Sequence, residues 1–454
     1  MNKHLIKKYN VPGPRYTSYP TVPYWENDTF SLIRWKQSLK QRFLENSTEE
    51  GISLYIHLPF CESMCTFCGC NKRITKKHEV EVPYIKSVLK EWKLYRELFG
   101  QRPVIKELHI GGGTPTFFSP ENLEFLIVGI LRGSHIAEEY EFSFEGHPNN
   151  TTEEHLKVLF DLGFRRVSFG VQDYNETVQK AIRRIQPFEN VERVTKLARK
   201  IGYTSIGHDL IFGLPFQTVD DVKHTIEKTR LLNPDRIAFY SYAHVPWIKG
   251  NGQRGFDEAD LPKAHQKQEM YQNGKQLLEE NHYSEIGMDH FALRTDSLYQ
   301  AVDEKRLHRN FMGYTASKTQ LMVGLGVSAI GDSWYGFAQN VKGVEEYRSL
   351  IDNNILPVFR GHILNEEDVI IRKHILNLMC KFSTQWSAEE GRFSELADVL
   401  IQLKEMESDG LLEIGSDHLK ITTKGIPFVR NICMGFDLRL KRKRPEAQLF
   451  SMTI

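Results

Sequence analysis

One ten-residue segment, residues 61–70, holds four of the chain's six cysteines and constrains the chain more than any other feature. Cys61, Cys65 and Cys68 are separated by three and then two residues, and Cys70 follows one residue later. Thiolates at this density usually hold a metal. Three thiolates on one loop can each reach a different iron of a [4Fe–4S] cube, which leaves the fourth iron open to a small molecule. Cys70 is ambiguous, because it could be the fourth ligand or a thiol beside the cluster.

Two other interpretations of the cysteines stay open. Four cysteines could bind zinc, although structural zinc sites normally combine two Cys-x2-Cys hooks from separated parts of the chain. Cys65 and Cys68 alone could form a thioredoxin-type redox pair. The additional Cys61 and the missing helical pattern after the pair argue against that interpretation.

The spacing Cys-x3-Cys-x2-Cys resembles that of the radical S-adenosylmethionine (SAM) enzymes. The resemblance implies that the amino and carboxylate groups of SAM chelate the open iron. It also implies that the reduced cluster cleaves the sulfonium to a 5′-deoxyadenosyl radical, which abstracts hydrogen from unactivated carbon. The run Gly111–Thr116 is not a P-loop, because no Gly-Lys-Ser/Thr follows it. In this superfamily such a run receives the methionine amino group of SAM.

The amino-acid composition argues against nucleic acid and membranes as binding partners. The 454 residues include 59 basic and 58 acidic side chains, a balance that gives no argument for nucleic acid. No apolar run approaches the length of a membrane span, and the N-terminus has no apolar signal region. Cys380 and Cys433 have apolar helical neighbours and are predicted to be core residues. We expect a cytoplasmic protein, since a reducing compartment suits this cysteine usage, and a monomer, since no coiled-coil pattern is visible.

Strand-like and helical patterns alternate between residues 52 and 242. The predicted strands are Ile52–His57, Val104–Ile110, Glu141–Glu145, Arg166–Gly170, Ser205–Ile211 and Arg236–Tyr242. The predicted helices between them are Tyr84–Phe99, Asn122–Leu131, Glu153–Leu162, Asn190–Ile201 and Val219–Leu232. Such alternation is typical of an α/β fold with a parallel sheet, here a partial (β/α) barrel. Ligands of such folds bind at the carboxyl ends of the strands, where the cysteine loop, Gly111–Thr114, Glu145, Gln172 and Asp209 fall.

The patterns divide the chain into three predicted domains. Residues 1–50 form an extended segment rich in proline and aromatic residues, followed by an amphipathic helix over Phe30–Phe43. Residues 51–355 form the catalytic barrel, with a further helix at 262–281 and a loop-rich, polar stretch at 285–309. Residues 356–454 form a mainly α-helical, winged-helix-like domain. Its predicted helices are Glu366–Lys381, Glu390–Glu407 and Thr423–Leu440, and its predicted hairpin strands are Leu411–Ile414 and Leu419–Ile421.

The winged-helix-like pattern has two interpretations. DNA binding is one, but the neutral charge and the absence of a recognition-helix pattern favour a packing or lid domain. The basic run Arg439, Lys441–Arg444 is typical of a solvated helix end.

Several segments together resemble the oxygen-independent coproporphyrinogen III oxidases (coproporphyrinogen dehydrogenases). They are Pro14–Pro20, Cys61–Asn71, Gly170–Asp173, Gly287–Phe291, His308–Thr315 and Arg430–Met434. They span nearly the whole chain. The last segment and Cys70 separate the chain from the shorter haem-chaperone relatives.

The resemblance implies a set of site residues, position by position. Cys61, Cys65 and Cys68 would bind the cluster. The residues that would hold SAM on the cluster are Tyr55, Gly112, Glu145 and Ile330. The family binds a second SAM beside the first, and the residues that would contact it are Phe67, Gly113, Thr114, Gln172, Arg184, Asp209 and Ala243. His57 precedes the loop and is expected to be a satisfied core histidine rather than a ligand.

The implied reaction is the oxidative decarboxylation of two propionates of coproporphyrinogen III to vinyl groups, which gives protoporphyrinogen IX. It requires an electron donor such as flavodoxin or ferredoxin, and an electron acceptor that the sequence does not identify. Four substrate carboxylates need cationic partners, and Arg15, His290, His308 and Arg309 are candidates. Equally, these four residues could tie the N-terminal segment to the barrel.

Three other functions stay open at this point. A different radical SAM enzyme acting on a tetrapyrrole would share the cysteine loop. A haem-binding delivery protein would bind haem without turnover. A zinc-dependent interaction module would use the same cysteines without iron.

Overall fold

The computed structural model describes residues 3–46, 50–246, 252–253, 255–387, 390, 394–443, 445 and 449–453. The chain forms two compact units that are not continuous in sequence. The larger unit comprises residues 30–299 and 319–361, and the smaller unit comprises residues 1–29, 300–318 and 362–454. The division into three consecutive domains stays a prediction. No helix in the described part of the chain is long and apolar enough to cross a membrane.

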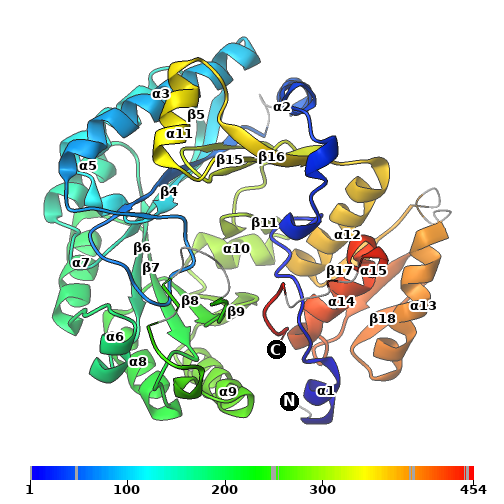
Figure 1. The fold of residues 1–454 in the computed structure, drawn as a ribbon. Helices are drawn as coiled ribbons and strands as arrows, with labels where there is room; N and C mark the ends of the chain where they lie inside the picture. The colour runs from blue at the N-terminus through cyan, green and yellow to red at the C-terminus, as the bar shows by residue number, and fades with distance from the viewer. Residues whose placement is uncertain are drawn as a thin grey trace. The chain divides into compact units, whose positions relative to one another are not determined.

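Six parallel strands form the centre of the larger unit (Figure 1). In spatial order they are β1 (Ile52–Leu58), β4 (Val104–Gly112), β5 (His135–Gly146), β6 (Arg166–Gln172), β7 (Ser205–Phe212) and β8 (Arg236–Ser241). Each neighbouring pair is parallel. Strands covered on both faces need apolar side chains, and the core includes Leu54, Ile56, Leu108, Ile110 and Phe144. The predicted parallel sheet of a partial barrel is therefore confirmed.

Helices connect these strands, and Figure 1 shows α5, α7 and α8 along the outer side of the sheet. The connecting helices are α3 (Glu81–Phe99), α4 (Pro120–Leu131), α5 (Glu153–Asp161), α6 (Glu176–Ala181), α7 (Phe188–Ile201) and α8 (Val219–Leu232). Local sequence sets the ends of α8. The Thr218 hydroxyl accepts from the Asp221 N–H at the start, and Asn233 ends the helix in the left-handed conformation. The sequence patterns located five of these six helices and missed the short α6.

The sheet continues beyond the six predicted strands on both sides. On the β1 side lie β13 (Met322–Leu325), which is parallel to β1, and then β14 (Ile330–Asp332) and β15 (Gly336–Asn340), which are antiparallel. On the β8 side lie β10 (His290–Ala292) and β9 (Ser284–Gly287), both antiparallel. The expectation that residues 285–309 are loop-rich was wrong for β9 and β10. These strands are too short to show alternation.

The larger unit contains further elements besides this sheet. They are α2 (Leu32–Asn46), β2 (Phe60–Cys61), β3 (Arg73–Ile74), α9 (Ala264–Glu280) and α11 (Val344–Asp352). Two elements contain residues of both units, namely α10 (Ser297–Asp303) and β16 (Val358–Ile363). The amphipathic N-terminal helix and the helix at 262–281 are thus present as α2 and α9.

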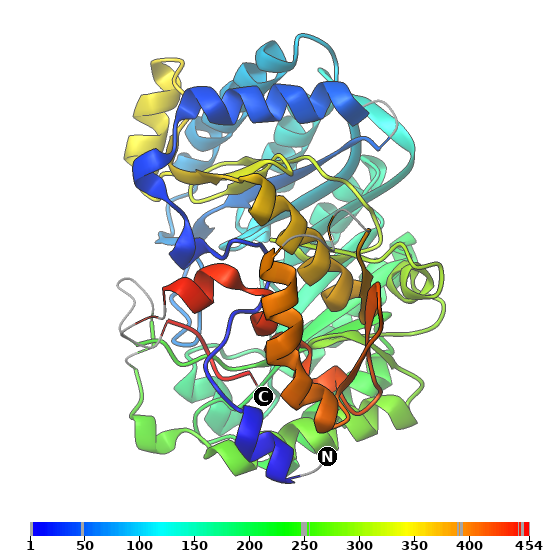
Figure 2. The same ribbon diagram turned by 90° about the vertical axis from the view of Figure 1, so that its right-hand side faces the viewer.

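The smaller unit is mainly helical and includes a three-stranded sheet with the order β17-β19-β18. Its helices are α1 (Lys3–Tyr9), α12 (Glu366–Lys381), α13 (Ser394–Ser408), α14 (Val429–Phe436) and α15 (Leu438–Arg442). Its strands are β11 (His308–Asn310), β12 (Gly313–Thr315), β17 (Ser383–Gln385), β18 (Leu412–Ile414) and β19 (His418–Ile421). Figure 2 shows α12 and α13, in gold and orange, with the strands of the sheet beside them. The prediction of a helical, winged-helix-like C-terminal part is confirmed.

Some details of this unit differ from the sequence patterns. The predicted helix Thr423–Leu440 is broken at Asp437, whose carboxylate accepts from the Leu440 N–H at the start of α15. The helix predicted from Glu390 is present from Ser394, and residues 391–393 lie outside the described residues. Arg444 of the basic run also lies outside them.

Candidate active site

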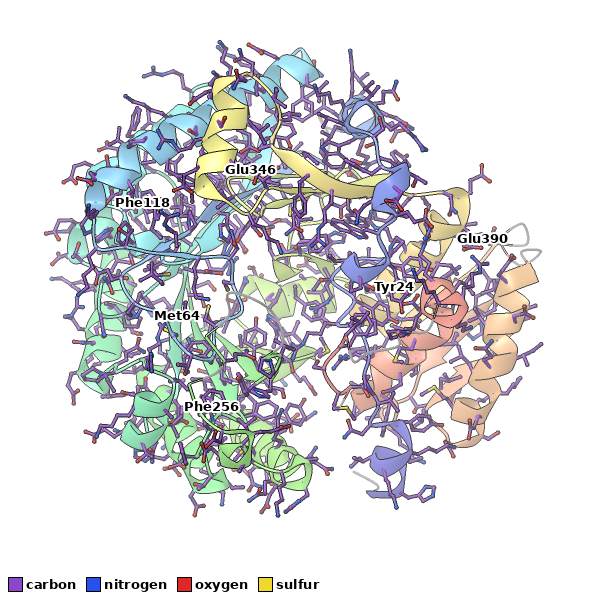
Figure 3. All side chains as sticks on the ribbon, viewed as in Figure 1. Tyr24, Met64, Phe118, Phe256, Glu346 and Glu390 are labelled. Atoms are coloured by element: carbon purple, nitrogen blue, oxygen red, sulfur yellow. The ribbon has the colours of Figure 1, made fainter. Side chains whose placement is uncertain are left out.

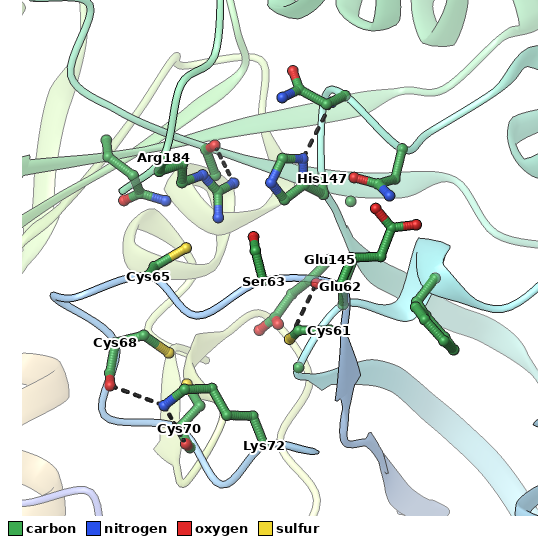
Figure 4. A pocket seen from close by; sticks show the side chains of 18 of the residues that line it. Cys61, Glu62, Ser63, Cys65, Cys68, Cys70, Lys72, Glu145, His147 and Arg184 are labelled. Atoms are coloured by element: carbon green, nitrogen blue, oxygen red, sulfur yellow. Dashed lines mark hydrogen bonds between the residues drawn. The ribbon is translucent and has the colours of Figure 1, made fainter. Parts of the chain in front are cut away.

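A cavity of about 390 Å³ opens at the carboxyl ends of the central strands, entirely within residues of the larger unit (Figure 4). Eleven of the fourteen predicted site residues line it: Cys61, Cys65, Cys68, Phe67, Gly112, Gly113, Thr114, Glu145, Gln172, Arg184 and Asp209. Tyr55, Ala243 and Ile330 do not line it. Residues that are distant in sequence therefore meet where parallel-sheet folds bind ligands.

The cysteine loop is fixed to the barrel directly before its first cysteine and again between Cys65 and Cys68. Phe60, directly before the loop, is buried against the rings of Tyr84, Phe117 and Phe118, with centroids 5.4–5.8 Å apart (Phe118 is labelled in Figure 3). Thr66 donates through its N–H to the Ile182 carbonyl at 3.0 Å and through its hydroxyl to the Ala181 carbonyl at 2.9 Å. These contacts hold the loop in place without using any thiol.

The three predicted ligand thiols line one cavity. Among the described residues, no three His, Cys, Asp or Glu side chains form a group that could hold a metal ion. Thiols spread around a cavity suit a cluster with several irons better than a single tetrahedral zinc. Three thiols in one cavity therefore fit a [4Fe–4S] cluster, and the assignment of Cys61, Cys65 and Cys68 as its ligands stays a prediction.

The surroundings of the thiols differ. Burial raises the pKa of Cys61 to about 11, although Thr114 donates a hydrogen bond to its sulfur at 3.4 Å. A hydrogen bond with Cys70 lowers the pKa of Cys68 to about 6. The Lys72 ammonium donates to the carbonyls of Cys68 and Cys70 at 3.2 and 3.4 Å, which places a positive charge at this end of the loop.

The glycine run at the end of β4 is required because other parts of the chain approach its backbone closely. A Cβ on Gly113 would lie 2.6 Å from the Pro59 carbonyl oxygen, and a Cβ on Gly112 would lie 2.8 Å from the His57 ring. Gly112 also has φ +117°, which side-chain-bearing residues rarely adopt. The Gly113 N–H donates to the Leu58 carbonyl at 2.8 Å. Glycine thus lets the end of β4 lie directly against the segment that leads into the cysteine loop.

Glu145 stands at the end of β5 and faces the same side as Ser143 and Glu141. The Gly112 N–H donates to its Oε2 at 3.2 Å, and Nε2 of His109 lies 3.5 Å from its Oε1. Burial alone would raise the pKa of Glu145, but the contacts with His109 and Gly112 lower it below its usual value. Glu145 is therefore a carboxylate at neutral pH and can bind an ammonium or hydroxyl group.

Asp209 and Arg184 also line the cavity. Burial and the charge of Glu145 raise the pKa of Asp209 to about 7, and the Ser168 hydroxyl donates to its Oδ1 at 2.9 Å. Nη2 of Arg184 donates to the Gly170 carbonyl at 2.8 Å. Arg183 also lines the cavity, but this hydrogen bond belongs to Arg184, the residue chosen from the sequence.

The three predicted residues outside the cavity wall lie in well-defined places. The Tyr55 ring is 6.0 Å from that of His109, and its hydroxyl is 3.1 Å from Nδ1 of His57. The Ala243 carbonyl and the Phe67 carbonyl both accept from Nε2 of Gln253 at 3.0 Å. Ile330 begins β14. Their roles toward a cofactor stay predictions.

His57 is a buried, hydrogen-bonded core histidine, as expected. It is 6% exposed, and its Nε2 lies 2.8 Å from the Asn71 carbonyl.

The four candidate substrate cations do not line the cavity. In the smaller unit, Arg309 is 7% exposed, donates to the Arg15 carbonyl at 3.3 Å and lies over the Tyr314 ring. His308 is 4% exposed in the same strand. His290, in the larger unit, lies 3.3 Å from the Tyr240 hydroxyl. Binding of substrate carboxylates by these residues stays a prediction.

Sequence reasoning missed part of the cavity wall. The additional lining residues include Glu62, Ser63, Lys72, His147, Asn149, Asn150 and Ile185. His147 to Asn150 directly follow β5, so their position after the end of a predicted parallel strand was a usable signal.

Three comparisons with known proteins, by family model, by sequence and by structure, agree with one another. The model of the radical SAM superfamily matches residues 55–229. Oxygen-independent coproporphyrinogen III oxidase from Helicobacter pylori is 41% identical over 445 residues, covering 96% of each chain. The enzyme of the same name from Synechocystis is 37% identical over 99% of this chain and 97% of its own. The structure of coproporphyrinogen III oxidase from Escherichia coli, described as a radical SAM enzyme, superposes with a TM-score of 0.89 at 35% identity, over 96% of this chain and 98% of that one.

Proposed function

This chain belongs to the family of oxygen-independent coproporphyrinogen III oxidases, and from that premise we propose that it oxidatively decarboxylates two propionates of coproporphyrinogen III. The products are the two vinyl groups of protoporphyrinogen IX and two molecules of carbon dioxide. The enzyme is a radical SAM oxidoreductase of haem biosynthesis, and its cofactors are a [4Fe–4S] cluster and SAM, of which it binds two molecules.

One observation of the structure supports this proposal above the others. Cys61, Cys65 and Cys68 line the same cavity as the glycine edge of β4 and the carboxylate of Glu145. Cluster ligands, a backbone edge with no side chains and a carboxylate are what an enzyme needs to hold a cluster and an amino-acid-bearing cofactor side by side.

The residues of the chain position and shield the reactants. When bound, the cluster and SAM supply the radical chemistry that removes hydrogen from unactivated carbon. Gly112 and Gly113 expose backbone groups along one edge of the cavity, and Glu145 offers an acceptor for the ammonium group of SAM. Phe67 covers part of the wall. Asp209 offers an acceptor for a second ammonium group or a ribose diol in the same cavity.

The partners of the reaction belong to the same proposal. A one-electron donor such as flavodoxin or ferredoxin reduces the cluster, and a separate, unidentified acceptor takes up the electron that remains after each decarboxylation. The enzyme acts as a monomer, and it uses neither nucleic acid nor a membrane surface.

An anaerobic turnover assay tests the proposal. Protein with a reconstituted cluster is supplied with reductant, SAM and coproporphyrinogen III, and the products are identified by mass spectrometry. Protoporphyrinogen IX should form together with 5′-deoxyadenosine. The Cys65→Ala variant should lose iron and both products. Met64→Ala is the matched control, because Met64 is 40% exposed in the same loop and does not line the cavity.

Two results would contradict the proposal in different ways. Formation of 5′-deoxyadenosine with unchanged porphyrinogen would mean that the enzyme acts on another tetrapyrrole or another substrate. No cleavage of SAM by a fully loaded cluster, together with stoichiometric haem binding, would favour a haem-delivery protein.

A further inference from the structure

The segment that directly follows the cysteine loop, residues 72–77, is strongly basic and is called the basic segment below. Its cations are Lys72, Arg73, Lys76 and Lys77. No acidic residue lies among them, although the whole chain balances 59 basic against 58 acidic side chains. All of these cations except Lys72 are exposed. Ile74, between them, is an apolar side chain that is 38% exposed. The segment therefore presents an apolar side chain with a basic rim.

The basic segment lies against the backbone of the predicted cluster ligands. Its strand β3 pairs in parallel with β2, and the Thr75 N–H donates to the Cys61 carbonyl at 2.9 Å. The Lys72 ammonium donates to the carbonyls of Cys68 and Cys70 (Figure 4). Of the four cations only Lys72 lines the cavity, and the other three are exposed outside it. The exposed basic surface thus begins at the cysteine loop itself.

Contacts at both ends fix the basic segment. Directly before it, Nδ2 of Asn71 donates to the Lys342 carbonyl at 3.2 Å. Directly after it, the His78 ring stacks on the Phe117 ring with centroids 4.5 Å apart. A partner would therefore meet a surface that is already formed, and would spend little binding free energy on ordering it.

The exposed cations are available to a partner. Lys76 forms no ion pair within the described part of the chain. Arg73 pairs with Glu345 at 3.0 Å, and the Lys77 ammonium lies 3.9 Å from Glu79. All four side chains of these two pairs are more than half exposed, and pairs of this kind contribute little because solvent screens them. The cations can therefore exchange these partners for carboxylates of another protein at little cost.

The position of the basic segment suits the delivery of electrons. The inference rests on the proposed function, which requires one electron for each SAM that is cleaved. Electron transfer between proteins falls off steeply with distance, so a donor must dock beside the loop that carries the cluster ligands. We propose that the basic segment is the docking surface for an acidic one-electron carrier protein, because charge complementarity favours such a partner. In each encounter one electron leaves the reduced carrier and enters the cluster, and no atom passes between the two proteins.

Substitution of the two consecutive lysines tests this surface. Lys76→Glu/Lys77→Glu reverses the charge of two exposed side chains, and Lys76→Gln/Lys77→Gln removes that charge without reversing it. Lys196→Glu/Lys200→Glu on α7 is the matched control, because it makes the same change of net charge at two other exposed lysines. Iron content and thermal stability of all three variants are compared with those of the parent.

Binding is measured without turnover, by anaerobic titration calorimetry of the cluster-loaded protein with oxidised flavodoxin, an acidic one-electron carrier. At low ionic strength Lys76→Glu/Lys77→Glu should weaken binding about 10-fold or more, and Lys76→Gln/Lys77→Gln should weaken it less. Both differences should shrink in high salt, because salt screens charges on the surface. The α7 control should bind flavodoxin as the parent does.

The rate of cluster reduction, followed by absorbance in a stopped-flow instrument, separates docking from damage to the cluster. At limiting donor concentration, reduced flavodoxin should reduce Lys76→Glu/Lys77→Glu about 10-fold more slowly than the parent. Reduced methyl viologen is a small donor that needs no docking surface, so it should reduce both proteins at the same rate.

The inference is overturned if Lys76→Glu/Lys77→Glu binds flavodoxin and accepts its electron as the parent does. It is also overturned if the α7 control loses the same affinity, which would be an effect of net charge, or if methyl viologen reduces the variant slowly as well, which would be damage to the cluster. A raised KM for coproporphyrinogen III with unchanged reduction by flavodoxin would assign the basic segment to the acidic substrate instead.

Turnover of the parent with methyl viologen as the donor separates this failure from that of the proposed function. A parent that makes protoporphyrinogen IX, while Lys76→Glu/Lys77→Glu is reduced normally by flavodoxin, refutes only the docking surface. A parent whose cluster is reduced but which leaves coproporphyrinogen III unchanged refutes the proposed function.

Discussion

Glu145 shows how single residues prepare this cavity for a charged ligand. Burial in the cavity wall opposes ionisation of its carboxylate. The carboxylate is ionised all the same, because His109 and the Gly112 N–H contact it. His109 is itself oriented, since its Nδ1 lies 2.8 Å from the Ser143 hydroxyl. The other nitrogen of His109, Nε2, therefore points at Glu145. His109 thus affects the binding of a ligand to Glu145 through this carboxylate, without touching the ligand itself.

Replacing His109 by leucine should weaken SAM binding. The substitution removes a polar partner of Glu145 and leaves burial to raise its pKa. A hydrogen bond to a charged group contributes about 1.5–3 kcal/mol, so the dissociation constant should rise roughly 10-fold or more. Equilibrium dialysis with SAM measures the change, and His265→Leu, on the exposed side of α9, is the control. An unchanged dissociation constant in His109→Leu would show that Glu145 does not depend on His109.

Asp209 should make stability depend on pH. Burial, with a contribution from Glu145, raises its pKa from 3.8 to about 7. The folded state therefore favours the protonated form, and its contribution to stability is present below about pH 4 and is lost as the pH rises through 7. The melting temperature of the parent protein should fall more between pH 6 and pH 8 than that of Asp209→Asn. Thermal unfolding of cofactor-free protein checks this, and parallel curves for the two proteins would contradict it.

At the scale of elements, polar contacts inside the sheet connect three parallel strands. Glu141 of β5 pairs with Arg166 of β6 at 2.9 Å and with Arg236 of β8 at 3.3 Å, and Arg236 also pairs with Asp296 at 2.7 Å. Burial alone would raise the pKa of Glu141, but the two guanidinium groups lower it to about 2. The strand β5, which carries Glu145, is thus held to β6 and β8 by charges as well as to β6 by backbone pairing.

Glu141→Ala should destabilise the larger unit strongly. It removes the carboxylate partner of Arg166 and leaves Arg236 with Asp296 as its carboxylate partner, and breaking a buried ion pair typically costs about 3–5 kcal/mol. Glu153→Ala is the matched control, because Glu153 pairs with Lys157 on the surface of α5 and should cost under about 1 kcal/mol. Urea unfolding followed by circular dichroism measures both. The low pKa also means that the contribution of Glu141 is present above about pH 4.5 and is lost as the pH falls toward 2. Equal midpoints for the two variants would contradict the structural role of Glu141.

Strands and helices were predicted well from the sequence in the part of the chain where strand and helix patterns alternate. Six parallel strands and five of their connecting helices follow from alternating strand and helix patterns, and α8 was predicted with its observed bounds. The strands β13 to β15 were missed because they are short, contain glycine and are buried on both faces, so no alternation marks them. The N-terminal fifty residues were expected to be extended before a single helix, but α1 also forms there.

At the scale of the molecule, the relation to known enzymes applies to the whole chain. The relative from Helicobacter pylori covers 96% of it, and therefore residues of both compact units. Most of the cavity could be predicted from the sequence, because the cysteine spacing and the ends of parallel strands identify residues by position. The hydrogen bonds of the cavity wall could not, since they depend on how separate loops pack, as where Nδ2 of Asn149 donates to the Ile185 carbonyl. Contacts of this kind become known only from the structure, where loops that are distant in sequence lie side by side.

The fate of one hydrogen atom shows most directly whether this enzyme oxidises the propionates of coproporphyrinogen III. Coproporphyrinogen III labelled with deuterium at the β-carbons of its propionates is supplied to the cluster-loaded enzyme with SAM and reductant under anaerobic conditions. If the enzyme abstracts hydrogen from that carbon, the 5′-deoxyadenosine should carry one deuterium and accumulate with protoporphyrinogen IX. If 5′-deoxyadenosine without deuterium forms beside the product, or if no product forms at all, the assigned reaction is wrong.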